Sequence, residues 1–374
     1  MKIGIDLLWV RPGKNGGTES YIRNLLNGFS QLEEDANSFI LFVSEDNADS
    51  FEEYDMFDVV RCPVNTASFT KRVVWENVNL LTFGKKHGVN LWFFPVYSRP
   101  LFMNGFPNVT VIHDLQALHY PEYFSRFRNL YFKIAWNADC KNSSKVLTIS
   151  EFCKKDIEKN YKKAIGKTDY IYNPILMTSD ASDFNLLAKK YDIKKGEYFY
   201  TVSSLAKHKN LITLLKAFKI LKDQGHSEIL LITGVKVNAV NEVMDYIREN
   251  DLKDNIIYTG FISDEDRNAL YDNCKTFLFP SVFEGFGMPP VEAMIRGVPV
   301  LTTKETSLYE VTEGKACYVE NPLDEMEWVR KMQEKITKME NNTSKHFAQK
   351  YSVQNISACY IELFNSLKLG GRRE

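Results

Sequence analysis

Short apolar runs alternate with amphipathic stretches along the whole chain. The first run, Lys2–Leu8, is rich in aliphatic residues and predicts a buried strand. A glycine-rich loop follows at Arg11–Gly17, and a pattern with the helical period begins at Thr18. One face of this helix carries Tyr21, Ile22, Leu25, Leu26 and Phe29. A strand, a glycine loop and a helix in this order predict the opening of an α/β unit.

This alternation occurs in two series, which predicts two parallel sheets that are each covered by helices. In the first series, further strands are expected at Phe39–Val43, Leu91–Phe94, Val109–Ile112 and Val146–Ile149. In the second, they are expected at Tyr198–Val202, Ile229–Thr233, Ile256–Thr259, Thr276–Phe279 and Val298–Thr302, with a helix at about Leu211–Leu221. We therefore predict an α/β fold of two Rossmann-like, doubly wound domains at residues 1–175 and 196–350, joined by a polar linker at 176–195. The last helix, within residues 351–374, has no strand after it, so we expect it to pack back on one of these domains.

Composition limits the classes of protein to which the chain can belong. Its 374 residues suit two domains of about 100–200 residues each. Lys and Arg number 47 against 48 Asp and Glu, so the basic excess of a nucleic-acid-binding protein is missing. The six cysteines include no C-x-x-C pair and the histidines are dispersed, which indicates reduced thiols and no zinc cluster. The apolar start is interrupted by Asp6, unlike a signal peptide, and no run approaches the about 20 apolar residues of a membrane span, so we predict a cytoplasmic protein.

The segment Phe279–Met294 carries the most distinctive chemical pattern. Glu284 and Glu292 have seven residues between them, and the glycines and prolines in this interval exclude one continuous helix. Pro289 or Pro290 suits the first turn of a helix, which places Glu292 in that turn and Glu284 in the loop before it. Carboxylates accept hydrogen bonds from hydroxyls, and the N–H groups of a helix start face anions, so the segment suits a hydroxyl-rich, phosphorylated ligand. The alternative for Glu292 taken alone is an acid that only stabilises the helix start.

This segment resembles the E-x7-E signature of retaining glycosyltransferases with the GT-B fold, in particular those of family 4. The likeness extends over nearly the whole chain, in the family's order and spacing. Its further landmarks are Gly16-Gly17-Thr18-Glu19, Ile112-His113-Asp114-Leu115, Pro121-Glu122-Tyr123-Phe124, Thr148-Ile149-Ser150-Glu151-Phe152, Tyr172-Asn173-Pro174 and Lys209-Asn210-Leu211. The resemblance implies that the two domains face a cleft in which the motifs converge. It is specific for the family and a weak guide to the substrate.

The resemblance also implies roles for the acidic segment. Glu284 would contact the donor sugar near the reacting carbon, and Glu292 would hold the ribose of the nucleotide. The backbone N–H groups of Phe286, Gly287 and Met288 would bind sugar hydroxyls or phosphate. The predicted donor is therefore a nucleotide-diphosphate sugar.

A second element, Val202–Leu211, lies between a predicted strand and a predicted helix. Departure of a nucleoside diphosphate builds negative charge, which a fixed cation stabilises. Lys209 matches the family's phosphate-binding lysine. The chain departs from the family at Ser204, where many members have arginine, and at His208, where a subgroup has arginine. Either a second cation is missing, or His208 or Lys207 replaces it.

Three further elements complete the predicted donor site. Glycines let a backbone approach a diphosphate closely, and in the family the Gly16–Gly17 region borders the donor phosphates. His113 follows a predicted strand, and the matching family histidine touches the donor sugar, either through a hydrogen bond that its ring donates or through its backbone carbonyl. The alternative for His113 is a structural histidine. The loop at Gly260–Phe261 would frame the base.

The acidic triplet Asp264-Glu265-Asp266 spells D-x-D, the metal motif of a different glycosyltransferase fold. Here Ser263 or Asp264 precedes Leu270 and Tyr271 in helical spacing, so we interpret the triplet as a helix cap with acids in the first turn. We predict no catalytic metal and no cofactor beyond the nucleotide sugar, which is a substrate.

Aromatic and basic residues interleave in the segment Tyr120–Lys133. One interpretation is a surface that rests on anionic lipid headgroups near a lipid-linked acceptor. The other, which we favour from sequence alone, is a core helix with a charged outer face.

Together these features predict a retaining hexosyltransferase that moves a mannosyl or similar residue from a UDP- or GDP-sugar to a saccharide or lipid-linked acceptor. Bacterial surface polysaccharide assembly is the setting that the resemblance implies. The predicted partners exclude nucleic acid and leave open a peripheral position at the inner face of the membrane. Two alternatives remain: a nucleotide-sugar epimerase of the same architecture, and a donor-binding subunit without catalytic activity.

Overall fold

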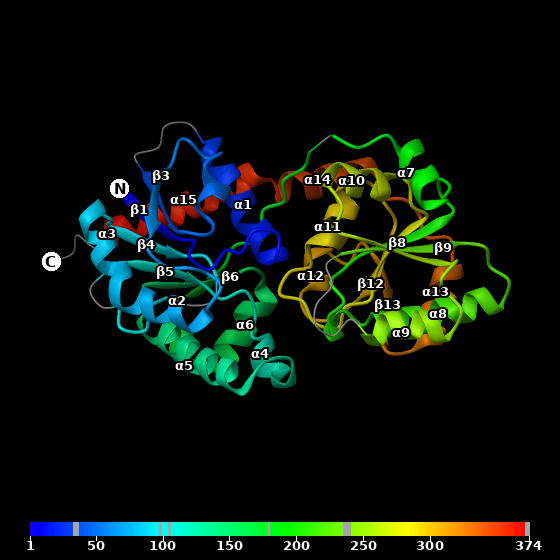
Figure 1. Ribbon diagram of the computed structural model, residues 1–374, viewed down its shortest axis with the longest axis horizontal. Coiled ribbons are helices and arrows are strands. Elements are labelled where there is room, and N and C mark those ends of the chain that lie inside the picture. Colours follow the sequence, from blue (N-terminus) through cyan, green and yellow to red (C-terminus); the bar gives the residue numbers. More distant parts are fainter. Residues whose placement is uncertain (33–36, 97–98, 104–105, 179, 235–240, 371–374) are drawn as a thin grey trace. The chain divides into compact units, whose positions relative to one another are not determined.

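The structure is a computed structural model that describes residues 1–32, 37–96, 99–103, 106–178, 180–234 and 241–370. The chain forms two compact units (Figure 1). Unit 1 comprises Met1–Leu176 together with Tyr351–Glu374, and unit 2 comprises Met177–Lys350. Each unit is described on its own below.

Unit 1 is built on a seven-stranded sheet in the order β3-β2-β1-β4-β5-β6-β7, in which all pairs are parallel. The strands are β1 (Lys2–Asp6), β2 (Ser38–Ser44), β3 (Asp58–Cys62), β4 (Leu91–Phe94), β5 (Asn108–Val111), β6 (Lys145–Thr148) and β7 (Thr168–Tyr170). The order reverses between β1 and β4, and such a reversal opens a crevice at the carboxyl ends of the strands.

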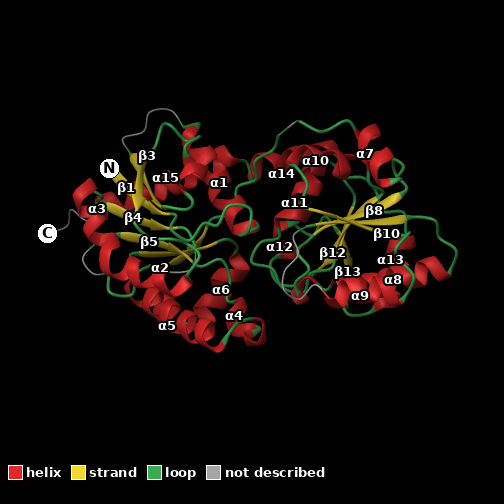
Figure 2. Ribbon diagram, in the orientation of Figure 1, coloured by secondary structure: helices red, strands yellow, loops and turns green. Residues whose placement is uncertain are grey.

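Helices lie on both faces of this sheet, as Figure 2 shows. They are α1 (Gly17–Ser30), α2 (Phe69–Trp75), α3 (Leu81–His87), α4 (Gln116–His119), α5 (Arg126–Asn142), α6 (Glu151–Asn160) and α15 (Val353–Gly370). Shorter helical turns are η1 (Ala48–Phe51), η2 (Glu76–Leu80), η3 (Pro121–Tyr123) and η4 (Lys162–Ala164). The last helix, α15, packs on α1 so closely that a Cβ on Gly28 would lie 1.9 Å from Ser357 Oγ. Tyr21 and Tyr360 join these two helices through a hydrogen bond of 2.7 Å between their hydroxyls.

Unit 2 repeats the pattern with six parallel strands in the order β10-β9-β8-β11-β12-β13. The strands are β8 (Tyr198–Val202), β9 (Ile229–Thr233), β10 (Ile256–Gly260), β11 (Thr276–Phe279), β12 (Val300–Thr303) and β13 (Cys317–Val319). The helices are α7 (Phe184–Tyr191), α8 (Leu211–Asp223), α9 (Asn241–Glu249), α10 (Asp264–Asn273), α11 (Met288–Ile295), α12 (Leu308–Val311), α13 (Glu325–Gln333) and α14 (Asn341–Lys350), with a 3₁₀ turn η5 (Lys207–Lys209). Leu214 and Phe218 of α8 and Trp328 of α13 anchor the core under one face of the sheet. The order reverses between β8 and β11. Two Rossmann-like domains with parallel sheets are thus confirmed.

The segment predicted as a linker, residues 176–195, belongs instead to unit 2 from Met177 onward and contains α7. Asp183 caps this helix by accepting from Asn185 N, and Leu187 is buried. Ser182 Oγ donates to Asp266 Oδ1 of α10 at 2.6 Å. The linker prediction was wrong because a short helix that buries only one leucine has the polar composition that is also typical of a linker.

No helix in the described ranges is both long enough and apolar enough to cross a bilayer.

Candidate functional site

Lys209 and Glu284 form an ion pair at the point where the strand order of unit 2 reverses. Lys209 ends the turn η5 after β8, and Glu284 lies in the loop after the neighbouring strand β11. The Lys209 Nζ–Glu284 Oε1 distance is 2.6 Å, and the side chains are 18% and 11% exposed. Lys209 Nζ also lies 5.5 Å from the centre of the Phe279 ring. In open α/β sheets this reversal is where ligands bind, so a cation and a carboxylate meet at the expected position.

Backbone hydrogen bonds hold the Glu284 loop independently of its carboxylate. Glu284 N donates to Thr306 Oγ1 at 3.0 Å, and Ser307 Oγ lies 3.0 Å from the carbonyl oxygens of both Glu284 and Phe286. Gly287 has φ +89°, and a Cβ there would lie 2.6 Å from Leu308 Cδ2. The segment after β12 therefore shapes the loop, and the position before α11 requires glycine.

Phe286, Gly287 and Met288 lie at the start of α11, as predicted. Phe286 is buried, Gly287 is the N-cap, and Met288 is the first helical residue, with Pro289 following it. The N–H groups at a helix start have no intrahelical acceptor and point toward any anion bound there. Binding of phosphate or sugar hydroxyls by these groups stays a prediction.

Glu292 lies in the second turn of α11 and not in the first, because the helix begins at Met288. Its partners come from α10: Tyr271 donates to Glu292 Oε2 at 3.2 Å, and Arg267 Nε lies 3.9 Å from the same oxygen. The Glu292 carboxylate raises the pKa of Arg267 above its ordinary value, although burial of the guanidinium opposes this shift. The view of Glu292 as a first-turn acid was therefore wrong. Arg267 and Tyr271 are site residues that sequence reasoning missed.

His208 and Ser204 lie on the segment between β8 and α8. The His208 carbonyl accepts from Val282 N at 2.9 Å and from Ser281 Oγ at 3.1 Å, which ties the η5 turn to the segment after β11. Burial and the neighbouring Lys209 ammonium lower the pKa of His208 to about 4. Its imidazole is therefore neutral at pH 7, which favours Lys207 over His208 as the replacement for the missing arginine. The Ser204 carbonyl accepts from Ser203 Oγ at 2.8 Å.

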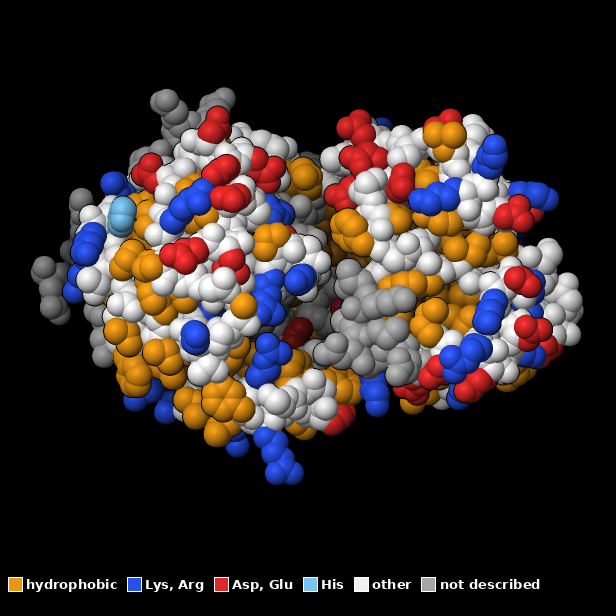
Figure 3. Space-filling view, viewed as in Figure 1, with side chains coloured by type: hydrophobic (Ala, Val, Ile, Leu, Met, Phe, Trp, Pro, Cys, Tyr) orange, Lys and Arg blue, Asp and Glu red, His pale blue; other side chains and the backbone are white. Residues whose placement is uncertain are grey.

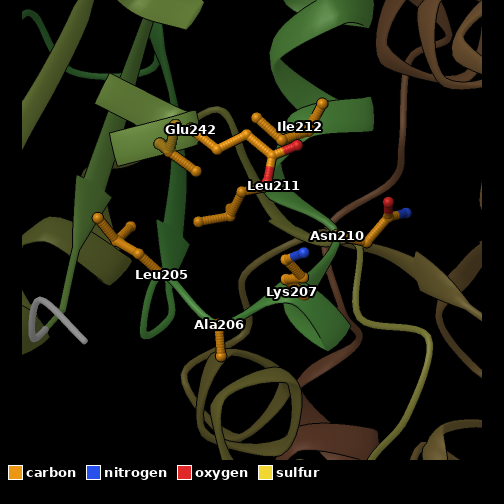
Figure 4. Close-up of a pocket in the computed structure, with 8 residues that line it drawn as sticks. Leu205, Ala206, Lys207, Asn210, Leu211, Ile212 and Glu242 are labelled. Atoms are coloured by element: carbon orange, nitrogen blue, oxygen red, sulfur yellow. The ribbon is translucent and has the colours of Figure 1, made fainter. Parts of the chain in front are cut away.

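A pocket of about 160 Å³ adjoins this segment. Figure 4 shows Leu205, Lys207, Asn210 and Leu211 along its border, with the side chain of Glu242 from α9 near Ile212. It is below the about 300–1,000 Å³ of typical ligand pockets, so by itself it does not hold a nucleotide sugar.

Gly260 and Phe261 mark the end of β10. Gly260 has φ +74°, and its carbonyl accepts from Gly234 N at 3.1 Å. The ring of Phe261 is 77% exposed, so it offers an open aromatic face. The framing of a base by these residues stays a prediction.

The remaining predicted residues belong to unit 1. Gly16 has φ +56° and is the N-cap of α1, and Gly17 is the first residue of that helix. His113 packs edge-on against Tyr21 of α1, with 4.7 Å between ring centres. The structure therefore brings His113 next to the helix that the glycine loop opens.

The tautomer of His113 follows from its hydrogen bond. Its Nε2 lies 2.9 Å from the carbonyl oxygen of Pro95, and burial lowers the pKa of the ring to about 4. A carbonyl only accepts, so the neutral ring carries its proton on Nε2, and Nδ1 is an acceptor. Of the two predicted contacts with a sugar, donation from the ring is disfavoured and the backbone carbonyl remains.

Comparison with known proteins identifies the family. One family model, Glycosyl transferases group 1, matches residues 183–351, and another, Glycosyltransferase Family 4, matches residues 15–176. The chain is a family-4 glycosyltransferase. Among curated proteins, the O-antigen chain mannosyltransferase RfbU of Salmonella typhimurium is 29% identical over 331 residues, which cover 85% of this chain and 87% of the relative. The O-antigen chain mannosyltransferase B of Escherichia coli is 31% identical over 226 residues, which cover 58% of each chain.

Solved structures confirm the GT-B fold of this glycosyltransferase. The Anabaena protein Alr3699/HepE, crystallised with UDP and glucose, has a TM-score of 0.76 at 20% identity and covers 98% of this chain and 100% of its own. WaaG, a glycosyltransferase of lipopolysaccharide biosynthesis, has a TM-score of 0.67 at 14% identity, with 95% of each chain covered. Such likenesses show the fold, while the O-antigen relatives place the glycosyltransferase in surface polysaccharide synthesis.

The acidic triplet of the glycosyltransferase is a helix cap, as predicted. Ser263 accepts from Asp266 N at the start of α10. Asp264 pairs with Arg267 at 2.8 Å, and Asp266 accepts from Ser182. Across the described ranges, no group of three or more His, Cys, Asp and Glu side chains could hold a metal ion.

Helix α5 of the glycosyltransferase does not fit the simple description of a core helix with a charged outer face. Its inner face is buried through Phe132, Trp136 and Cys140. Its outer face exposes three large apolar side chains: Phe127 (59%), Leu130 (59%) and Ile134 (51%). The exposed charged side chains of α5 are all basic, namely Arg126, Arg128, Lys133 and Lys141. In Figure 3, orange and blue side chains gather over the part of unit 1 where Figure 1 places α5.

Proposed function

We propose that this glycosyltransferase transfers a hexose, mannosyl or similar, from a UDP- or GDP-sugar to a saccharide or lipid-linked acceptor, with retention at the anomeric carbon. The observation that carries the proposal is the Lys209–Glu284 pair of 2.6 Å at the strand-order reversal of unit 2. The mannosyltransferases among the relatives support the sugar, and their O-antigen substrates support the polysaccharide setting.

In the proposed reaction, the bond between the anomeric carbon and the diphosphate oxygen breaks, and its electron pair leaves with the diphosphate. Lys209 and the N–H groups at the start of α11 stabilise the charge that develops there. The acceptor oxygen bonds to the anomeric carbon on the same face, and its proton passes to the departing diphosphate. Glu284 accepts hydrogen bonds from donor-sugar hydroxyls, which orients the ring.

The proposal is tested by incubating the full chain with GDP-mannose or UDP-glucose, with and without a saccharide acceptor extract, and by analysing every product. We expect one donor to release nucleoside diphosphate in step with a new glycoside whose linkage keeps the donor's anomeric configuration. An isomerised donor formed without acceptor would establish the epimerase instead. Tight donor binding, detected by a thermal shift, without turnover on any acceptor would establish the inactive subunit.

We also propose that unit 1 associates peripherally with an anionic membrane through α5. A helix with apolar and basic residues on its outer face can lie in the headgroup region, where each basic side chain contributes about 1 kcal/mol. The outward row of Phe127, Leu130 and Ile134, flanked only by basic exposed charges, supports this position for an enzyme with a lipid-linked acceptor.

Replacing Phe127, Leu130 and Ile134 together with glutamine is expected to lower binding to phosphatidylglycerol vesicles by about tenfold or more, because the apolar area available for insertion is lost. Sedimentation with vesicles measures the bound fraction. Leu186→Gln is the control, since Leu186 is an exposed leucine (68%) on α7 of unit 2. Equal binding by the triple variant and the control would exclude α5 as the docking element.

A further inference from the structure

A cavity in unit 1 lies beside the glycine loop and is lined in part by Arg11 and Asn15 of that loop. Its volume is about 280 Å³, and it lies at the carboxyl ends of the strands of the unit 1 sheet. Trp9 and Arg11 come from the segment after β1, Phe69 and Arg72 from α2, and Arg128 and Phe132 from α5. The reversal of strand order beside β1 makes this end of the sheet the place where a ligand is expected.

Three guanidinium groups line the cavity, and each is positioned differently. Arg11 is held by the backbone, because its Nε and Nη2 donate to the Thr66 carbonyl at 3.2 and 3.0 Å and Nη2 also donates to the Ala67 carbonyl at 2.7 Å. In the part of the chain that the structure describes, its Nη1 is left to meet a ligand. Arg72 is buried and pairs with Glu76 at 2.6 Å. Arg128 is exposed and lies 5.2 Å from the centre of the Phe69 ring, while Arg72 lies 5.4 Å from the same ring. Arg72 and Arg128 thus share one aromatic side chain, while Arg11 is fixed by backbone carbonyls.

The positive charge of the cavity is only partly compensated. Glu76 balances Arg72, and Asp6 also lies near this guanidinium, with burial raising the pKa of Asp6 well above its ordinary value. Within the described ranges, no ion pair joins Arg11 or Arg128 to a carboxylate. Two cations without counter-charges in the lining of one cavity favour an anionic ligand, and guanidinium N–H groups donate charge-assisted hydrogen bonds to phosphate oxygens.

The other walls are aromatic. Trp9 and Phe132 are buried, and Phe69 and Phe124 are partly exposed toward the cavity. Apolar walls with a few convergent polar groups are typical of small-molecule sites. The volume is just below the about 300 Å³ at which typical ligand pockets begin, so the cavity suits one monosaccharide-sized group and not an oligosaccharide.

We propose that this cavity binds a phosphorylated sugar at the head of the acceptor, with its ring against the aromatic wall and its phosphate between Arg11 and Arg128. The proposal rests on the proposed function, because it assigns the acceptor of that transferase. The phosphate can be soluble or can be attached to a lipid, and the two sources share the same contacts in the cavity.

The first test uses mannose 1-phosphate as the probe, with mannose for comparison, and measures affinity for the full chain by calorimetry. We expect mannose 1-phosphate to bind more tightly than mannose. Arg128→Gln should weaken its binding by about tenfold or more, because a charge-assisted hydrogen bond is lost. Arg126→Gln is the matched control on the same helix and should leave affinity unchanged, since Arg126 does not line the cavity. Equal affinities for the two probes, or equal losses in the two variants, would overturn the proposal.

A second pair of measurements separates this site from the donor site and identifies the phosphate source. Lys209→Ala should not change the affinity for mannose 1-phosphate at the cavity; loss in that variant would place the probe in unit 2 and overturn the assignment. Vesicles that carry polyprenyl phosphomannose should bind more tightly than matched vesicles without it, and loss of this difference in Arg128→Gln identifies the lipid-borne source. A chain that shows the Arg128 dependence but transfers no sugar would contradict the proposed function and leave the cavity assignment in place.

Discussion

Replacing Lys209 with alanine is expected to lower kcat for sugar transfer by about 10²–10³-fold, the usual loss when a fixed group that stabilises developing charge is removed. The ammonium lies 2.6 Å from Glu284 at the strand-order reversal, where the diphosphate would depart. Its interaction strengthens as charge builds on the leaving group, so kcat should fall more than affinity for the donor. Steady-state kinetics with the donor and acceptor found for the wild type measure both quantities.

Glu284→Gln extends this test to the other member of the pair. The loop keeps its hydrogen bonds to Thr306 and Ser307, which involve only the backbone of Glu284, so the substitution removes charge without releasing the loop. We expect a comparable loss in kcat, and a double variant with Lys209→Ala that loses less than the product of the two single effects, because the pair acts as a unit. Lys216→Ala on the following helix is the control, since its partner Glu325 lies outside this site. Rates within a few-fold of the wild type in both single variants would refute the site assignment.

Lys207 is the other cation on the η5 turn, and its side chain is exposed. With the His208 ring neutral at pH 7, Lys207 is the remaining candidate to replace the arginine that the family has near Ser204. If Lys207 only assists Lys209 in stabilising the departing diphosphate, Lys207→Ala should lower kcat less than Lys209→Ala does.

Sequence pattern predicted the central strands well and missed three of the four edge strands, the exception being β10. Strands Leu91–Phe94, Tyr198–Val202 and Ile229–Thr233 begin and end where the apolar runs do. The strands that were not predicted, β3, β7 and β13, all lie at an edge of a sheet. An edge strand is shorter or less covered, so it lacks the continuous apolar run that identifies a buried parallel strand. In β3, for example, Asp58 and Arg61 are exposed.

The candidate site was predictable where it depends on motif and topology. The parallel-sheet rule predicts that loops after neighbouring strands converge, and Lys209 and Glu284 meet although 75 positions separate them. Arg267 was not predictable, because its proximity to Glu292 arises only when α10 and α11 pack in the folded domain. For a related reason, the sequence did not favour an exposed apolar face on α5 over a core helix: the period of apolar residues does not tell which of two apolar faces the core covers.

The largest loss of stability is expected when a second ion pair, between Arg99 and Asp139 in unit 1, is broken. Arg99 Nε and Asp139 Oδ1 are 3.7 Å apart, and neither side chain is exposed. Arg99 Nη1 also donates to the carbonyls of Pro100 and Met103. Burial raises the pKa of Asp139, and this rise is opposed by the Arg99 guanidinium first, then by the backbone N–H of Arg99 and by Lys167. Nearby positive charge therefore offsets much of the cost of burying this carboxylate.

Arg99→Met is therefore expected to lower the free energy of unfolding by about 3–5 kcal/mol at pH 7, because it leaves a buried carboxylate without its counter-charge. Four of the five tryptophans lie in unit 1, so urea unfolding followed by tryptophan fluorescence reports mainly on that unit. Arg61→Met is the matched control: Arg61 is exposed and pairs with Asp49 and Glu52 on the surface, so its loss should cost no more than about 1 kcal/mol.

The pH dependence of this variant gives a check that a simple packing defect would not reproduce. Burial raises the pKa of Asp139 well above its ordinary value, and the Arg99 guanidinium opposes that rise, so removing Arg99 raises the pKa further. Between the unfolded and folded pKa values, the folded state holds a proton that the unfolded state has released, so stability falls as pH rises. The deficit of Arg99→Met should therefore shrink between pH 8 and pH 5, and adding Asp139→Asn should recover most of it at pH 8. A deficit that stays constant over this range would mean that the lost guanidinium acted through packing and not through its charge.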